Sequence, residues 1–104
     1  MTREITDASF KSVLAEGKPV VVDCWAPWCG PCRMQIPILD QVAAKVPAVK
    51  IGKVNVDDEP DLAARYGVNT IPYLVVFKDG QKKADFVGLR QANALVEALT
   101  DVDS

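Results

Sequence analysis

The chain has 104 residues, which is enough for one compact domain built around one hydrophobic core. Its apolar share of 49% and charged share of 25% are those of an ordinary globular protein, not of a disordered or fibrous chain. The formal net charge is −2 and no long basic segment occurs, so we expect no direct binding to nucleic acid. We expect residues 1–104 to form a single domain.

The beginning of the chain lacks the positive, then apolar, then small-residue layout of a signal peptide. No apolar run approaches the ~20 residues that are needed to cross a bilayer. We therefore expect a cytoplasmic protein that does not contact a membrane. No feature predicts a homo-oligomer, so a monomer is expected.

The first quarter of the chain predicts two strands with a helix between them. A short strand is expected at residues 3–6. Residues 7–16 have apolar side chains at helical spacing behind Asp7, which can cap a helix. Residues 20–26 are almost continuously apolar, which is typical of a central strand that is covered on both faces.

The middle of the chain predicts a long helix, a strand and a short helix. Residues 28–33 form a turn that leads into a helix ending near residue 45, in which Pro37 is expected to cause a kink. The apolar stripe of this helix consists of Ile36, Leu39, Val42 and Ala43. Residues 49–56 alternate as in a strand, and residues 58–66 predict a short helix that is closed by a glycine.

The last third predicts a hairpin and a final helix. Residues 73–77 and 83–87 predict two strands, and the Asp79-Gly80 pair between them is a strong hairpin signal. Residues 91–102 predict an amphipathic helix. The element order indicates an α/β fold with a central mixed β-sheet of about five strands flanked by about four helices.

The chain contains three cysteines and no histidine. Cys29 and Cys32 lie three residues apart where the apolar strand passes into the long helix, so their Cα atoms should lie within the roughly 4.4–6.8 Å that a disulfide requires. A zinc site needs about four ligands, and Cys24 is the only further thiol, so we expect no metal. A purely structural disulfide is also not expected, because so short a loop constrains little.

The position of these cysteines at the start of a helix has a chemical consequence. Helix N-termini carry partial positive charge and unpaired N–H groups, which should lower the pKa of Cys29 and make it a reactive thiolate. Cys32 lies deeper in the turn and is suited to resolve a mixed disulfide. Pro31 fits a first helical turn, and Gly30 keeps the approach to the sulfur open. These residues predict dithiol–disulfide exchange.

The motif Trp-Cys-Gly-Pro-Cys after an apolar strand resembles the active site of the thioredoxin family, and the resemblance covers nearly the whole chain. The further matching positions are Asp23, Trp25, Ala26, Pro27, Pro37, Lys53, Asp57, Tyr66, Gly67, Val68, Ile71, Pro72, Phe77, Gly80 and Gly88. The resemblance implies a thioredoxin-like fold and reduction of protein disulfides without a cofactor. It also implies recycling by a thioredoxin reductase, a flavoprotein that draws on NADPH.

The resemblance implies roles for two thiols and two charged residues. Cys29 attacks the substrate disulfide and Cys32 resolves the mixed disulfide. Asp23 lies beneath the cysteines and relays the proton that activates Cys32, and burial should raise its pKa. Lys53 on the next strand moderates that rise. The alternative is that Asp23 and Lys53 form a buried ion pair without a catalytic part.

The resemblance also implies a docking surface for substrates. Pro72 is similar to the family's cis-proline, which exposes a backbone edge at Ile71 where an extended substrate segment can pair. The alternative is an ordinary trans proline at the start of a strand. Trp28, Val87 and Gly88 complete the apolar surface around the cysteines.

Two positions depart from the family's pattern. Tyr73 follows Pro72, where thioredoxins commonly have threonine, and its ring either narrows the docking groove or lies across the surface. Cys24 stands where the family often has phenylalanine, and strand alternation turns it away from Asp23. We expect Cys24 to be a small buried apolar residue, with a regulatory thiol as the alternative. Its small size leaves a packing deficit unless neighbours fill the space.

The acidic segment 57–61 is explained better by helix capping than by calcium binding, because calcium loops need a different spacing of oxygens.

Two other functions would use the same cysteine pair or the same fold. A disulfide oxidant or isomerase would use the same cysteines, but Gly30-Pro31 resembles the reducing members of the family. A binding module that uses the fold as a clamp often lacks a cysteine, the buried acid or the proline, and none of these is missing here.

Overall fold

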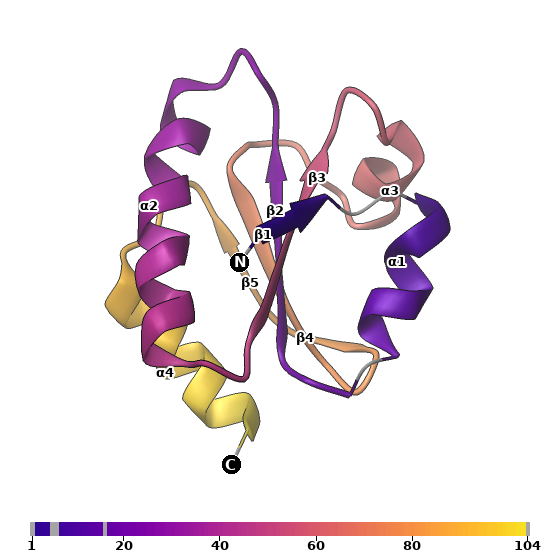
Figure 1. The fold of residues 1–104 in the computed structure, drawn as a ribbon. Coiled ribbons are helices and arrows are strands. Elements are labelled where there is room, and N and C mark those ends of the chain that lie inside the picture. The colour runs from indigo at the N-terminus through magenta and orange to yellow at the C-terminus, as the bar shows by residue number, and fades with distance from the viewer. Residues whose placement is uncertain (1, 5–6, 16, 104) are drawn as a thin grey trace.

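The structure is a computed structural model that describes residues 2–4, 7–15 and 17–103. In this part of the chain, a five-stranded mixed sheet is covered by helices on both faces, which confirms the predicted α/β class (Figure 1). The elements are β1 (Thr2–Glu4), α1 (Asp7–Leu14), β2 (Val20–Trp25), α2 (Gly30–Lys45), β3 (Lys50–Asn55), α3 (Pro60–Arg65), β4 (Tyr73–Lys78), β5 (Gln81–Val87) and α4 (Ala92–Asp103).

Strand β2 lies at the centre of the sheet, whose strand order is β1-β3-β2-β4-β5. It pairs in parallel with β3 and antiparallel with β4, and β5 completes the β4 hairpin. Residues 20–24 are all buried, as the continuous apolar run predicts for a central strand. The end of this strand is therefore a rigid platform for whatever follows it.

The two faces of the sheet carry separate cores. Helices α2 and α4 cover one face and α1 and α3 cover the other (Figure 1). The α2/α4 core includes Val21, Leu39, Val42, Leu95 and Leu99, and the α1/α3 core includes Phe10, Val13, Val22, Leu62 and Phe77. Because successive side chains of β2 alternate, Asp23 points to the α2 side and Cys24 to the α1/α3 side.

The buried side of α2 differs from the predicted stripe. Ile36 is 42% exposed, whereas Gln35 is fully buried. The buried residues of this helix are Cys32, Gln35, Leu39 and Val42. Counting back four positions from Leu39 reaches residue 35, so helical spacing puts the polar residue on the buried line and its apolar neighbour at the edge. The helix continues through Pro37 to Lys45.

Several boundaries also differ from the prediction. Strand β5 begins at Gln81, so the hairpin loop is the two residues Asp79 and Gly80, with φ of 55° and 78° as a tight primed turn requires. Helix α1 ends at Leu14, and residue 16 lies outside the described residues. The first strand covers residues 2–4, and the predicted positions 5 and 6 also lie outside.

Cys24 and Tyr73 are directly opposite each other on β2 and β4 and belong to the same buried cluster. The Tyr73 ring is buried there, and its hydroxyl donates to Asp85 Oδ2 at 2.8 Å. Neither surface position expected for this ring is correct, because strand alternation turns it to the face opposite Asp23. Because the small and the large side chain face the same core from adjacent strands, we expect the Tyr73 ring to occupy space that Cys24 leaves.

This pairing predicts coupled effects on stability. Cys24→Phe overpacks the cluster and should cost about 1–3 kcal/mol. Tyr73→Thr leaves a cavity and should cost about 2–4 kcal/mol. The double variant should be more stable than the sum of the two losses by at least about 1 kcal/mol, measured by urea unfolding. Tyr73→Phe isolates the hydroxyl contribution, and strictly additive losses would contradict the compensation.

Candidate active site

The chain leaves β2 after Trp25 and enters α2 through a short loop that holds the cysteines. Cys29 is the N-cap residue of α2, and its N–H donates to the carbonyl of Ala26 at 3.1 Å. A disulfide joins Cys29 and Cys32, whose Cα atoms lie 5.3 Å apart, within the predicted range. Pro31 lies in the first turn of the helix, where its missing N–H costs no intrahelical bond.

The sulfur of Cys29 is placed to carry negative charge when the disulfide is reduced. The backbone N–H of Cys32 donates to Cys29 Sγ at 3.2 Å, as a capping side chain receives a bond at a helix N-terminus. The helix dipole acts in the same direction. Both cysteines are buried, but a Cβ added at Gly30 would meet no atom within 4 Å. A partner therefore has room to approach beside Cys29.

Of the expected docking residues, Ile71 lies beside this sulfur, and Gly88 is bonded to the neighbouring Pro72. The Ile71–Pro72 peptide bond is cis, and the carbonyl oxygen of Ile71 lies 3.8 Å from Cys29 Sγ. The N–H of Gly88 donates to the carbonyl of Pro72 at 2.8 Å, which holds the end of β5 beside the proline. Val87 is exposed next to this bond.

Trp28 forms the most prominent apolar feature near the cysteines, with 68% of its surface exposed. Its indole Nε1 donates to Asp57 Oδ2 at 3.0 Å, and the N–H of Asp57 in turn donates to Asn55 Oδ1. Asp57 thus fixes the indole. The sequence did not predict this role, because the acidic segment 57–61 was interpreted as a helix cap.

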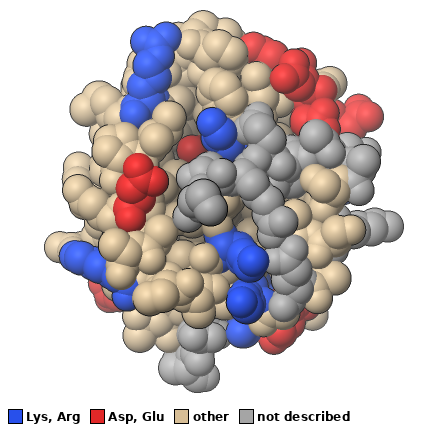
Figure 2. Space-filling model, in the orientation of Figure 1, with Lys and Arg blue, Asp and Glu red and all other residues tan. Residues whose placement is uncertain are grey.

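Glu59, the N-cap residue of α3, makes no side-chain capping hydrogen bond. The acidic side chains gather over α3 in Figure 2.

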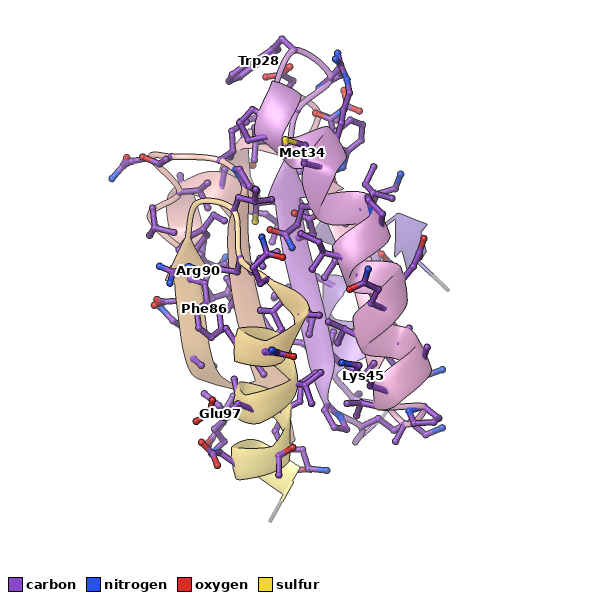
Figure 3. All side chains as sticks on the ribbon, turned by 90° about the vertical axis from the view of Figure 1, so that its left-hand side faces the viewer. Trp28, Met34, Lys45, Phe86, Arg90 and Glu97 are labelled. Atoms are coloured by element: carbon purple, nitrogen blue, oxygen red, sulfur yellow. A yellow bond between two sulfur atoms is a disulfide. The ribbon has the colours of Figure 1, made fainter. Side chains whose placement is uncertain are left out.

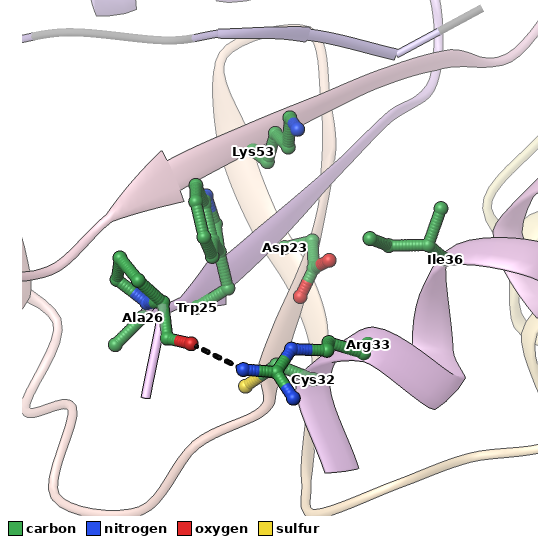
Figure 4. A pocket seen from close by; sticks show the side chains of 8 residues that line it. Asp23, Trp25, Ala26, Cys32, Arg33, Ile36 and Lys53 are labelled. Atoms are coloured by element: carbon green, nitrogen blue, oxygen red, sulfur yellow. Dashed lines mark hydrogen bonds between the residues drawn. The ribbon is translucent and has the colours of Figure 1, made fainter. Parts of the chain in front are cut away.

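A cavity of about 270 Å³ lies behind the disulfide (Figure 4). It is lined by Asp23, Trp25, Ala26, Pro27, Cys32, Arg33, Ile36 and Lys53. The guanidinium of Arg33 borders it and donates to the carbonyl of Pro27 at 2.9 Å (Figure 4). The buried carboxyl group and the inner cysteine thus face one shared space.

Asp23 is the only acidic side chain that is buried among the described residues, with 1% of its surface exposed. Burial raises the pKa of Asp23 to about 7, and the positive charge of Lys53 opposes this rise. The Oδ1 atom has no hydrogen-bond partner in the described part of the chain. A buried carboxyl group with a free oxygen and a pKa near neutrality is suited to exchange protons.

Lys53 stands beside Asp23 on the adjacent parallel strand, as expected. Its ammonium lies over the Trp25 ring, 5.1 Å from the ring centroid. The indole therefore holds this cation by a cation–π contact, while the Lys53 charge acts on Asp23 through space. The alternative of a tightly bonded ion pair finds no support at Asp23 Oδ1, which is unpaired in the described structure.

The remaining thiol is inert by comparison. Cys24 is buried as a free cysteine in the α1/α3 core, as expected. Burial, followed by the charge of Asp23, raises its pKa to about 12. A thiol of this kind is not a nucleophile at neutral pH.

The described residues contain no group of three or more His, Cys, Asp or Glu side chains that could hold a metal ion.

A disulfide capping a helix at the end of a central strand, with a buried acid behind it, defines a dithiol–disulfide oxidoreductase. Comparison with known proteins agrees: the Thioredoxin family model matches residues 1–101. Thioredoxin 1 of Synechococcus elongatus is 47% identical over 97 residues, covering 91% of each chain. The chain therefore belongs to the thioredoxin family and is a protein-disulfide oxidoreductase.

Solved structures show the same relationship in three dimensions. The thioredoxin of Fasciola hepatica superposes with a TM-score of 0.86 at 36% identity, covering 97% of this chain and 98% of that one. A mutant thioredoxin from Halobacterium salinarum superposes with a TM-score of 0.90 at 31% identity, covering 96% and 88%. No helix in the described part of the chain combines the length and apolar character needed to cross a bilayer.

The raised pKa of Asp23 predicts how stability depends on pH. Between about pH 4 and pH 7 the folded protein keeps the Asp23 proton and the unfolded chain releases it, so this residue lowers the free energy of unfolding as pH rises. Asp23→Asn should remove this pH-dependent decrease in the free energy of unfolding. The variant should therefore be more stable than the unmodified oxidised protein at pH 8 by roughly 2–4 kcal/mol.

Urea unfolding at pH 4 and pH 8 measures this effect. The same amide substitution at the exposed Asp40 of α2 serves as the control and should change stability by less than about 0.5 kcal/mol. Equal stability of the Asp23→Asn variant and the unmodified protein at pH 8 would contradict the protonation argument.

Proposed function

We propose that the protein reduces disulfides of other proteins, with Cys29 as the attacking thiol. The Cys29 thiolate attacks one sulfur of the substrate disulfide, forms a mixed disulfide and releases the other sulfur as a thiolate. Cys32 then attacks Cys29 Sγ, which releases the second substrate thiolate and closes the Cys29–Cys32 disulfide. The single observation that carries this assignment is the N–H of Cys32 on Cys29 Sγ at the helix N-terminus.

Asp23 is the base for the second step in this proposal. Cys32 must lose its proton before it can resolve the mixed disulfide, and a buried thiol does not do so unaided. Asp23 and Cys32 line the same cavity, which is large enough for water to bridge them. Lys53 keeps the carboxyl group acidic enough to release the proton again, since its charge lowers the pKa of Asp23.

The docking surface in this proposal consists of backbone and apolar side chains. An extended segment of the substrate pairs with the backbone of Ile71 beside Pro72, while Trp28 and Val87 cover its apolar side chains. Gly30 and Gly88 leave room for the substrate backbone. Tyr73 contributes through its backbone position only, because its ring is in the core.

The electrons come from a thioredoxin reductase, a flavoprotein that draws on NADPH, and the chain itself uses no cofactor because its two thiols carry both electrons. We further propose that the protein acts as a monomeric single domain in the cytoplasm and binds neither membrane nor nucleic acid. The matches to thioredoxins over most of the chain support this assignment.

The order of attack predicts opposite behaviour of two serine variants. Cys32→Ser should form a stable mixed disulfide with a protein substrate, since nothing resolves it. Cys29→Ser should form none and should have no reductase activity. Mass spectrometry after reaction with an oxidised protein measures both, and Cys24→Ala, the third cysteine, should retain full turnover. Trapping through Cys32 in the Cys29→Ser variant alone would reverse the assignment.

The direction of electron flow predicts the reduction potential of the Cys29–Cys32 pair. A reductant should have a value below about −250 mV, measured by equilibration against a redox couple and thiol trapping. A value above about −200 mV would instead assign the chain to the disulfide oxidants or isomerases.

A further inference from the structure

Gln35 is the one uncharged polar side chain that is fully buried among the described residues, and the mechanism above does not use it. It lies on α2 in the buried line of the helix, three positions after Cys32. The nitrogen and the oxygen of its side-chain amide both form hydrogen bonds with Arg90. Nε2 donates to the carbonyl of Arg90 at 2.9 Å, and the N–H of Arg90 donates to Oε1 at 2.9 Å. The side chain thus satisfies both backbone groups of Arg90.

Arg90 belongs to the segment 88–91 that connects β5 to α4 (Figure 3). This segment begins at Gly88, whose N–H is bonded to Pro72, and it follows the exposed Val87. Its two ends are therefore tied to different parts of the active site, one to the cis-proline and the other to α2.

The Arg90 side chain supports the same arrangement. Its guanidinium donates to the carbonyl of Val87 at 3.3 Å and lies over the Phe86 ring, 5.5 Å from the centroid (Figure 3). These contacts hold Arg90 against β5, and its hydrogen bonds to α2 in the described part of the chain are those with the Gln35 amide.

Burial of an amide inside an apolar core is costly unless both of its ends are bonded. An apolar side chain on the same line of α2 would pack against Leu39 without that requirement. Gln35 therefore adds what packing alone does not supply, namely two hydrogen bonds that join the helix that carries Cys32 to the segment that carries Gly88.

We propose that Gln35 is a positioning residue for protein substrates. By fixing segment 88–91 to α2, it holds Val87 and Gly88 where they form one side of the groove beside Ile71. This inference rests on the docking surface of the proposed function. A small disulfide reaches Cys29 without using that groove, whereas an extended protein segment must fit it. Loss of the amide should therefore impair protein substrates selectively.

The test compares two substrates in single turnovers of the fully reduced protein. Insulin provides disulfides that are flanked by polypeptide segments, and bis(2-hydroxyethyl) disulfide provides a disulfide without a peptide. Gln35→Met keeps the length of the side chain and removes both hydrogen bonds. The matched control is Gln41→Met, the same change at an exposed position of α2.

Gln35→Met should raise the insulin concentration for half-maximal rate about tenfold, and should leave the maximal rate and the small-disulfide rate constant within about twofold. Gln41→Met should change none of these. An equal loss with both substrates, or an unchanged insulin dependence, would overturn the positioning role. If the unmodified protein reduces neither substrate, the proposed function fails first and the positioning role fails with it.

Amide hydrogen exchange gives a readout that does not depend on activity, and its first measurement uses the unmodified protein alone. The N–H of Arg90 should exchange slowly in the unmodified protein, because a buried side chain accepts it. In Gln35→Met its exchange should approach that of the exposed neighbour Gln91, while the N–H of Gly88 on Pro72 keeps at least part of its protection. Fast exchange at Arg90 in the unmodified protein would overturn the proposal directly.

Discussion

The carboxyl group of Asp23 lies in the central strand, where the surrounding structure leaves only 1% of the residue exposed. Placing an ionisable group there opposes folding at neutral pH, because its charged form loses hydration. The cavity behind the disulfide and the Lys53 charge reduce this cost without removing it. The same burial raises the pKa of Asp23 to about 7, so in the proposed mechanism one feature sets both the loss of stability and the capacity for proton transfer.

The redox pair is supported by segments that are far apart in the chain. The N-terminus of α2 supplies the N–H bond to Cys29, the Ile71–Pro72 segment faces the sulfur, and segment 88–91 flanks the proline. The Cys29–Ile71 and Gly88–Pro72 contacts each join two of these segments, and the Gln35 amide joins segment 88–91 to α2. In the proposed function, these backbone and side-chain contacts hold the docking surface in shape and leave its apolar side chains free for different partners.

Prediction from sequence succeeded where the signal was local. The apolar run of β2, the spacing of Cys29 and Cys32, and the Asp79-Gly80 turn depend on neighbouring residues and were identified correctly. Gln35 was missed because apolar periodicity excludes a glutamine from the core unless its partner is known, and that partner lies 55 residues away. Asp57 was misassigned for the same reason, since its partner Trp28 comes from a different segment.

The departures at Cys24 and Tyr73 show how a local substitution can mislead. In sequence, Tyr73 adjoins the cis-proline and therefore suggests a changed docking groove. Strand alternation, however, decides which face of the sheet its side chain takes, and that face is the α1/α3 core, where Cys24 lies opposite. The side chains of both unusual residues therefore act on packing beneath α1 and α3. In the proposed function, the choice of substrate depends on the exposed Trp28 and Val87 and on the Gln35 amide, which joins α2 to the segment after β5.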